Sequence, residues 1–285
     1  MKHNININSL KMPIKKTITY GLTKKVALFA NARDESHIKE WAAHHLLIGF
    51  DNIIIFDHKS LQPLKEVFKN FDNRVIIIRN NADGAIKMPL MNSAIEIAKK
   101  INVDWFIYLD ADEFIILHDK FKGIKQLLNI YNRADSLAVN WLMFGSNYLV
   151  NDPDNMLEMY TKSELLLNDH VKCFVRPNEA INADIPHYYN IKNPNRMYGL
   201  NGRIPPGPFN KLQIPFYKSP MYIAHYVYQS EESYTKRKIN LPRDDTGELR
   251  GGDAKTIHNS YNDIDNLQVK MKYSQNIKKF LESRK

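Results

Sequence analysis

The chain has 285 residues, of which 44% are hydrophobic and 25% charged, so it can bury the core of one large α/β domain or of two small ones. Its single cysteine, Cys173, excludes an internal disulfide, and no Cys/His spacing of a zinc site occurs. The formal net charge of +9 means that a polyanionic partner must be considered, whether nucleic acid, anionic lipid or a nucleotide diphosphate.

The first segment of the chain is polar and contains several lysines. Residues 1–24 include no apolar stretch of the length of a signal peptide or a membrane helix, so we expect a cytoplasmic or otherwise soluble protein. Few apolar side chains are available to anchor this segment to a core. We therefore expect a flexible arm that is dispensable for folding.

From residue 26 onward, strand and helix patterns alternate along the chain. Short apolar runs predict strands at 26–30, 52–56, 75–78 and 105–109. Amphipathic stretches predict a helix capped by Ser36 and closed by Gly49, a helix at 62–68, and a helix that carries Pro89 in its first turn and ends near Lys100. Such a succession predicts a mostly parallel sheet with helices on both faces.

Polar residues cluster directly after each predicted strand. Arg33 and Glu35 follow the first strand, Asp57 follows the second, residues 79–83 follow the third, and residues 110–113 follow the fourth. Parallel strands end at a common edge, and sheets of this kind bind their ligands there. No Walker lysine loop and no GxGxxG motif occurs, which disfavours a P-loop ATPase and a dinucleotide-binding oxidoreductase.

The most specific chemical signal is the acidic sequence DADE at residues 110–113. On an extended backbone, Asp110 and Asp112 would project from one face and Glu113 from the other. Two converging carboxylates at a strand end suit Mg²⁺ or Mn²⁺, which keep coordination positions open for phosphate oxygens. The alternative is that these acids end a strand and only face water.

The pattern is less regular in the second half of the chain. We expect a helix at 124–131, strands at 136–144 and 221–227, a helix from a Ser230 cap through Lys236, and a basic amphipathic helix at 264–281. The proline-rich segment 203–215, RIPPGPFNKLQIP, is expected to form a long ordered loop or lid.

Short motifs follow one another in a defined order between about residues 25 and 245. They are ARDE (32–35), KEW (39–41), His45, Gly49, Asp57, DWFIYLDADEF (104–114), Trp141, FGS (144–146), RP (176–177), His187 and His225. As an ordered set they resemble glycosyltransferase family 92 and its bacterial relatives of the family-2-like group. The resemblance implies a GT-A (Rossmann-like) fold, a nucleotide-sugar donor, a divalent metal and β-galactosyl transfer with inversion. The chain departs from the family at Asp34, which is usually Asn, and at Ala111.

The resemblance also implies roles for individual residues. The expected metal ligands, for Mn²⁺ or Mg²⁺, are Asp110, Asp112 and His225. The residues expected to bind the nucleotide sugar, for which UDP-sugar is the expected donor, are Arg33, Glu35, Asp57, Asp110, Lys236 and Arg243. Of these, Arg33, Glu35 and Asp57 would hold the base and ribose, although each could equally cap the helix that follows it.

An inverting transfer also requires a general base for the hydroxyl of the acceptor. Asp184 is the candidate, with Glu179 and Asp169 as alternatives in the same half of the chain. Trp141 and His187 are expected to contact the acceptor, which would be a glycan, glycoprotein or glycolipid. The competing interpretation of Trp141 is a core residue.

The expected organisation is an arm (1–24), a single GT-A domain (25–245) and a C-terminal helical extension (246–285). The domain would comprise a nucleotide-sugar-binding half (25–118) and an acceptor half (119–245). The basic final helix predicts either a solvated face or weak membrane-surface association. No specific nucleic-acid partner is expected. The rival functions are a non-catalytic carbohydrate-binding protein of the same fold and a Toprim-like nucleic-acid enzyme, with a haloacid-dehalogenase phosphatase disfavoured by Phe114 after the acids.

Overall fold

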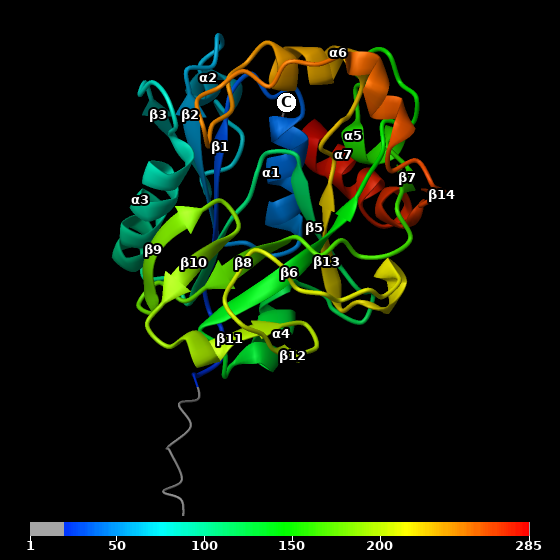
Figure 1. Cartoon of the computed structure of the whole chain (residues 1–285). Coiled ribbons are helices and arrows are strands. Elements are labelled where there is room, and N and C mark those ends of the chain that lie inside the picture. The colour runs from blue at the N-terminus through cyan, green and yellow to red at the C-terminus, as the bar shows by residue number, and fades with distance from the viewer. Residues whose placement is uncertain (1–19, 285) are drawn as a thin grey trace, which may run out of the picture.

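The central element is a mixed sheet, which we describe from a computed structural model covering residues 20–284. Within that range ten strands join in the order β12-β11-β6-β8-β4-β1-β2-β3, with β13 paired to β6 and β5 paired to β13 (Figure 1). The strands are β1 (Val26–Ala32), β2 (Asn52–His58), β3 (Val75–Asn80), β4 (Trp105–Tyr108), β5 (Glu113–Leu117), β6 (Ser136–Met143), β8 (Val171–Val175), β11 (Met197–Gly199), β12 (Gly202–Arg203) and β13 (Met221–His225).

Helices and two small sheets surround this sheet. The helices are α1 (Ile38–Leu47), α2 (Leu64–Val67), α3 (Lys87–Lys100), α4 (Ile124–Leu128), α5 (Met156–Met159), α6 (Glu231–Tyr234) and α7 (Gln275–Glu282). The small sheets pair β9 (Ala180–Ile185) with β10 (Tyr188–Ile191), and β7 (Lys162–Ser163) with β14 (Ile264–Asp265). The predicted α/β class, with a mostly parallel sheet flanked by helices, is confirmed.

The first half of the sheet follows directly from the sequence pattern. Strands β3, β2, β1 and β4 are parallel neighbours. Alternate residues of β1 enter two cores, because side chains alternate across a strand: Val26 and Leu28 pack on the side of α1, whereas Ala27 and Phe29 pack on the side of α3. A strand buried on both faces is therefore apolar throughout. Figure 1 shows α1 and α7 on one side of the sheet, and α3 with β9 and β10 on the other.

Two local predictions in this half require correction. Helix α1 begins at Ile38, and the residue at its N-cap is His37 rather than Ser36. The acidic residues after β4 do not continue an extended strand, because β4 pairs with β1 and β8 whereas β5 leaves to pair with β13. Residues 109–112 form the turn between these two strands. The alternation of side chains expected for an extended backbone therefore does not apply to Asp110 and Asp112.

Helix α1 holds the backbone of β5 in place through three ring nitrogens. Trp41 Nε1 donates to the carbonyl oxygen of Glu113 at 2.7 Å, and His44 Nε2 lies 2.8 Å from that of Ile115. His45 Nδ1 lies 2.9 Å from the Trp41 carbonyl oxygen, which leaves His45 Nε2 to accept from the Ile115 amide at 3.3 Å. Trp41 and His45, which belong to the ordered motifs, thus position the strand that follows the acidic turn.

The C-terminal residues are part of the main core. Val269, Tyr273 and Ile277 are buried in it, and the Tyr273 hydroxyl accepts from the Leu117 amide at 3.1 Å. Of the predicted helix 264–281, the first two residues form β14 and the helical part consists of a π-helical turn, Lys270–Ser274, followed by α7. Between residues 20 and 284, none of the helices has the length and apolar character needed to cross a membrane.

The chain contacts the core from residue 20 onward, which is earlier than the predicted end of the arm at residue 24. Residues 1–19, the rest of the predicted arm, lie outside the described residues. The Tyr20 hydroxyl donates to Asp135 Oδ1 at 2.8 Å, and its amide donates to the Asn132 carbonyl at 3.2 Å. The guanidinium of Arg176 lies 3.5 Å from the centroid of the Tyr20 ring and 4.2 Å from that of Trp105. The predicted arm boundary at residue 24 is therefore wrong. Tyr20 belongs to the folded domain because its ring covers the buried guanidinium of Arg176 and its hydroxyl binds Asp135.

Replacing Tyr20 by Ala is expected to lower the free energy of unfolding by about 1–2 kcal/mol, because a hydrogen bond and a cation–π contact are lost together. Urea unfolding of the full chain measures this change. The matched control is Leu22→Ala, since the Leu22 side chain is 76% exposed. Equal midpoints for the two variants would contradict the anchoring role of Tyr20.

Candidate functional site

A cavity of about 240 Å³ lies at the carboxyl ends of β1 and β4, where the sequence pattern predicted a binding site. The acidic turn after β4 forms one wall. Trp141 of β6 and His225 of β13 also line the cavity, together with several residues between 237 and 250. We refer to this cavity as the first pocket.

Asp112 is the most enclosed acid of the first pocket, with a side chain only 1% exposed. Its Oδ2 accepts from Arg237 Nη2 at 2.6 Å and from Lys238 Nζ at 3.1 Å. Burial by itself would raise the pKa of Asp112, but Lys238 and Arg237 outweigh burial and hold this pKa well below its usual value. The other oxygen, Oδ1, lies 3.6 Å from His225 Nε2 and has no hydrogen-bond partner among residues 20–284.

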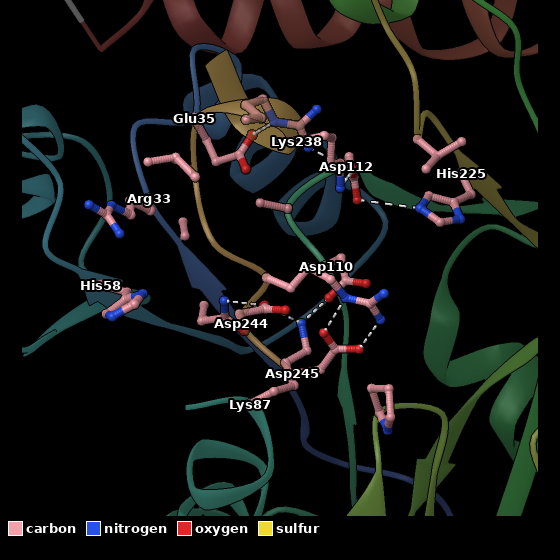
Figure 2. A pocket seen from close by; sticks show the side chains of 18 of the residues that line it. Arg33, Glu35, His58, Lys87, Asp110, Asp112, His225, Lys238, Asp244 and Asp245 are labelled. Carbon is pink, nitrogen blue, oxygen red and sulfur yellow. Dashed lines mark hydrogen bonds and ion pairs between the residues drawn. The ribbon is translucent and has the colours of Figure 1, made fainter. Parts of the chain in front are cut away.

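Asp110 faces a different set of partners. Its carboxylate pairs with Lys87 of α3 and, at 3.1 Å, with Lys172 of β8. Lys87 also pairs with Asp244 Oδ2 at 3.0 Å. Burial would raise the pKa of Asp110, yet Lys172 and Lys87 lower it far below its usual value. Figure 2 shows Asp112 turned toward His225 and Lys238, whereas Asp110 points toward Lys87 and Asp244.

The predicted metal-ligand trio of Asp110, Asp112 and His225 is therefore not assembled. In the described part of the chain, no three His, Cys, Asp or Glu side chains are grouped so that they could hold a metal ion. The physical reason is the pair of buried lysines, whose charges require a carboxylate nearby and draw Asp110 away from Asp112. Only Asp112 and His225 remain adjacent.

Glu113 stands apart from the two aspartates, because it is fully buried and does not line the first pocket. Its Oε2 accepts from the Asp110 amide at 2.9 Å, which closes the acidic turn. Burial raises the pKa of Glu113 to about 7, partly offset by Lys172, whose Nζ lies 3.7 Å away. Glu113 thus holds the shape of the turn.

Five other residues predicted for the site do line the first pocket: Arg33, Glu35, Arg243, Trp141 and His187. Glu35 forms an ion pair with Arg237, with 2.7 Å between Oε2 and Nε, so Arg237 joins Glu35 to Asp112. Arg243 pairs with Asp245 at 2.7 Å. These ion pairs link the residues after β1 to the acidic turn and to the residues between 237 and 250.

Three predicted site residues lie elsewhere. Asp57 accepts from the Leu64 amide at 3.0 Å and pairs with Arg79 at 2.8 Å, so it caps α2 instead of facing a ligand. The side chain of Lys236 is 62% exposed and pairs with Glu232. Asp184 is exposed on β9. The assignments of Asp57 and Lys236 to donor binding and of Asp184 to the general base are therefore corrected, and the alternative bases Glu179 and Asp169 do not line the first pocket either.

Sequence reasoning missed four basic residues that do reach the acids: Lys87, Lys172, Arg237 and Lys238. Lys172 had a visible signal, since it is a lysine inside the apolar strand VKCFV. A charged residue buried within a strand requires a partner. For Arg237 and Lys238 the signal was ambiguous, because they follow Lys236 in a π-helical turn, Thr235–Ile239, where the direction of each side chain does not follow α-helical spacing.

A segment that we call the strap, residues 240–250, contributes several residues to the lining of the first pocket. The carbonyl of Asp244 accepts from the amides of Ile86 and Lys87 at 2.9 and 2.8 Å, and Asp244 Oδ2 accepts from Asn31 Nδ2 at 2.8 Å. Gly247, at φ +78°, passes so close to Gly84 that a Cβ would lie 3.3 Å from its Cα. The strap is thereby tied to the start of α3 and to the end of β1.

No protein-family profile matches the chain. In structural comparisons it is similar to TarS of S. aureus solved with UDP (12% identity, TM-score 0.38, covering 54% of this chain and 47% of TarS). It is also similar to HddC of Yersinia pseudotuberculosis (15% identity, TM-score 0.33, covering 57% of this chain and 80% of HddC). Likeness at these TM-scores is too distant to support an argument about the site.

A comparison of sequences is more informative. The chain is 21% identical over 207 residues to a glycosyltransferase family 92 protein of Ricinus communis, a match that covers 70% of this chain. The match covers 34% of the relative, so the chain aligns with only about a third of that protein's length. The resemblance to glycosyltransferase family 92 that the ordered motifs indicated is confirmed by this match.

Proposed function

We propose that the chain is a glycosyltransferase that moves a sugar from a nucleotide diphosphate donor, expected to be a UDP-sugar, to a hydroxyl of a glycan or other acceptor. The observation that carries this proposal is the convergence of Lys87, Lys172, Arg237 and Lys238 on the acidic turn. These residues come from α3, β8 and the turn after α6. Cations from separate elements that meet at the carboxyl edge of a parallel sheet are suited to a diphosphate.

The chemistry required of such a pocket is charge stabilisation. When the bond between the anomeric carbon and the diphosphate oxygen breaks, negative charge grows on the departing diphosphate. Groups that are already oriented toward this charge lower the barrier without reorganising. Arg237 is oriented by Glu35 and Asp112, and Lys87 by Asp110 and Asp244, so both are fixed before a donor arrives.

The placement of Asp112 and His225 supports a second proposal, a divalent-cation site with two protein ligands. Asp112 Oδ1 and His225 Nε2 are 3.6 Å apart, which is too far for a hydrogen bond, and this oxygen has no partner within the described residues. Mg²⁺ is commonly held by one or two carboxylates together with substrate phosphates, and an imidazole nitrogen suits Mn²⁺. We propose that Asp112 and His225 hold Mn²⁺ or Mg²⁺, which when bound would neutralise charge on the diphosphate.

The volume of the first pocket bears on how a donor would enter. At about 240 Å³ it is smaller than the roughly 300–1,000 Å³ that small-molecule sites occupy. Asp244 of the strap lines the first pocket and shares Lys87 with Asp110. A diphosphate that binds Lys87 would compete with Asp244 for this ammonium. We therefore propose that donor binding displaces the strap.

The test of the proposed function is a melting experiment with UDP and Mn²⁺. Addition of both ligands is expected to raise the melting temperature more than either alone, because ligands that bind only the folded state stabilise it by about 2.7 kcal/mol at one hundred times Kd. Mn²⁺-dependent hydrolysis of UDP-sugars then separates an enzyme from a non-catalytic carbohydrate-binding protein. No shift at millimolar UDP and Mn²⁺, in a sample that melts cooperatively, would refute the proposal.

Neighbouring lysines provide a matched pair of variants. Lys238→Met is expected to weaken UDP binding about ten-fold, equivalent to about 1.4 kcal/mol, because Lys238 lies beside Asp112 in the first pocket. Lys236→Met is expected to leave Kd unchanged, since the Lys236 side chain faces solvent. Isothermal titration calorimetry measures both constants. Equal weakening by the two substitutions would show that only the net charge matters.

A further inference from the structure

A second cavity of about 720 Å³ opens at the surface between residues 164–170 and the proline-rich loop 203–215. Its lining consists of residues 164–170 with Phe209, Gln213 and Asp263. It is wide and shallow, and we call it the second groove. None of the donor-binding residues described above lines it.

A continuous series of aromatic rings joins the first pocket to the second groove. The centroid of the His225 ring lies 4.3 Å from that of Trp141. The Trp141 ring in turn stacks on His170, with 5.2 Å between the centroids and an angle of 14° between the ring planes. His170 meets Phe209 edge to face at 4.8 Å. Trp141 and His225 line the first pocket, whereas His170 and Phe209 line the second groove. The two cavities therefore share one aromatic wall.

The proline-rich loop is held so that Phe209 stays at the surface. The Val171 amide donates to the Pro208 carbonyl at 3.1 Å, and the Asn210 amide donates to the Asp169 carbonyl at 2.8 Å. Asn140 Nδ2 donates to the Asn210 carbonyl at 2.6 Å. Hydrogen bonds on both sides of Phe209 fix its backbone, although its side chain remains 52% exposed. An aromatic ring that is fixed and exposed can bind a ligand at little cost in conformational entropy.

The polar residues of the second groove restrict what it can bind. Glu164, Asp169 and Asp263 carry negative charge, and Asn168 and Gln213 offer amide donors and acceptors. Acids along a groove repel nucleic acids and anionic lipids. Exposed apolar surface with neutral hydrogen-bonding groups beside it suits a ligand that has apolar faces and hydroxyl edges.

We infer that the second groove binds a neutral oligosaccharide chain, with the end of the chain at Trp141 and His187 in the first pocket. This inference rests on the proposed function, because it makes the bound chain the acceptor. Sugar rings present C–H faces to Phe209 and His170, and their hydroxyls meet Asn168 and Gln213. The aromatic wall continues to the pocket where the donor would react, so a chain bound in the groove places its terminal hydroxyl there.

The experiment measures retention of the labelled full chain on immobilised neutral oligosaccharides of one to six sugar units. Retention is expected to increase with chain length and to fall at least ten-fold for Phe209→Ala. Phe209→Tyr, which keeps the ring, is expected to restore it. The matched control is Tyr217→Ala, because Tyr217 is also 52% exposed yet lines neither cavity.

Failure of this inference is distinguishable from failure of the proposed function, because stabilisation by UDP and Mn²⁺ is measured on the same samples. If UDP and Mn²⁺ stabilise the protein but no neutral glycan retains it, the assignment of the second groove is overturned and the proposed function stands. Retention that depends on Phe209 without stabilisation would support the groove and refute the proposed donor. Equal retention of Phe209→Ala and Tyr217→Ala, or retention on anionic lipid or peptide in place of neutral glycans, would also overturn the assignment.

Discussion

Asp112→Asn is expected to lower metal-dependent hydrolysis of the donor by at least about 100-fold, a loss typical of removing one charge-stabilising group from an active site. Asn has the same size but no negative charge, so the proposed cation would lose its carboxylate ligand. The fold is expected to persist, because Arg237 keeps its ion pair with Glu35. The loss of stability is expected to be about 1–3 kcal/mol, as for a buried hydrogen-bonded group that loses its charge.

The control for this substitution is Glu113→Gln at the neighbouring position. The amide of Gln can still accept from the Asp110 backbone amide, and Glu113 does not line the first pocket. We therefore expect Glu113→Gln to change stability more than rate. Initial rates across a Mn²⁺ titration, together with melting curves, distinguish the two variants. Equal rate losses at both positions would show that the whole acidic turn, and not the Asp112 carboxylate, determines activity.

Stability is expected to fall steeply as the pH drops from about 6.5 to about 4, because two neutral histidines are buried beside β5. Burial lowers the pKa of His44 to about 4 and that of His45 well below its usual value, with a further contribution from His44. In the unfolded chain a histidine has a pKa near 6.5, so the unfolded state binds protons first as the pH falls. The full free energy of unfolding is present above pH 6.5. Protonation linked to His44 alone would lower it by about 3 kcal/mol at pH 4.

The hydrogen bonds explain why protonation cannot be accommodated at this site. His45 Nε2 accepts from the Ile115 amide, and a proton on this nitrogen would place two donors against each other. His44→Gln can preserve a donor to the Ile115 carbonyl while removing one titrating group. Urea unfolding at several pH values is expected to show a shallower pH dependence for His44→Gln than for the unsubstituted chain. Identical slopes in the two proteins would exclude His44 as the source.

The sequence predicted strands and helices correctly where the spacing of apolar residues is compatible with only one kind of secondary structure. The apolar runs that became β1, β2 and β4 are buried on both faces, whereas β3 at the edge of the sheet is only partly buried. The long helix α3 between β3 and β4 has an apolar face of helical period. Local spacing does not reveal which distant strands will pair. The antiparallel insertion of β8 between β4 and β6, and the departure of β5 toward β13, depend on contacts across long sequence separations.

The candidate site divides in the same way. That Asp110 and Asp112 lie at the edge of the sheet that holds the first pocket followed from their position directly after an apolar strand, as did the presence of Arg33 and Glu35 there. Asp57 occupies an equivalent position at the end of β2, yet both of its carboxylate oxygens accept from backbone amides, those of Ser60 and of Leu64 at the start of α2. A polar residue at a strand end can cap the next helix or face the pocket, and its neighbours in sequence do not decide between these uses.

By itself the amino-acid sequence determined the α/β class, the edge of the sheet where the acids gather, and the resemblance to glycosyltransferase family 92. These depend on hydrophobic period and on the order of motifs, both of which are local properties of the chain. Only the tertiary structure decided which charge meets which carboxylate. Lys87 and Lys172 come from α3 and β8 and separate Asp110 from Asp112, because buried ammonium groups must be paired once folding removes them from water.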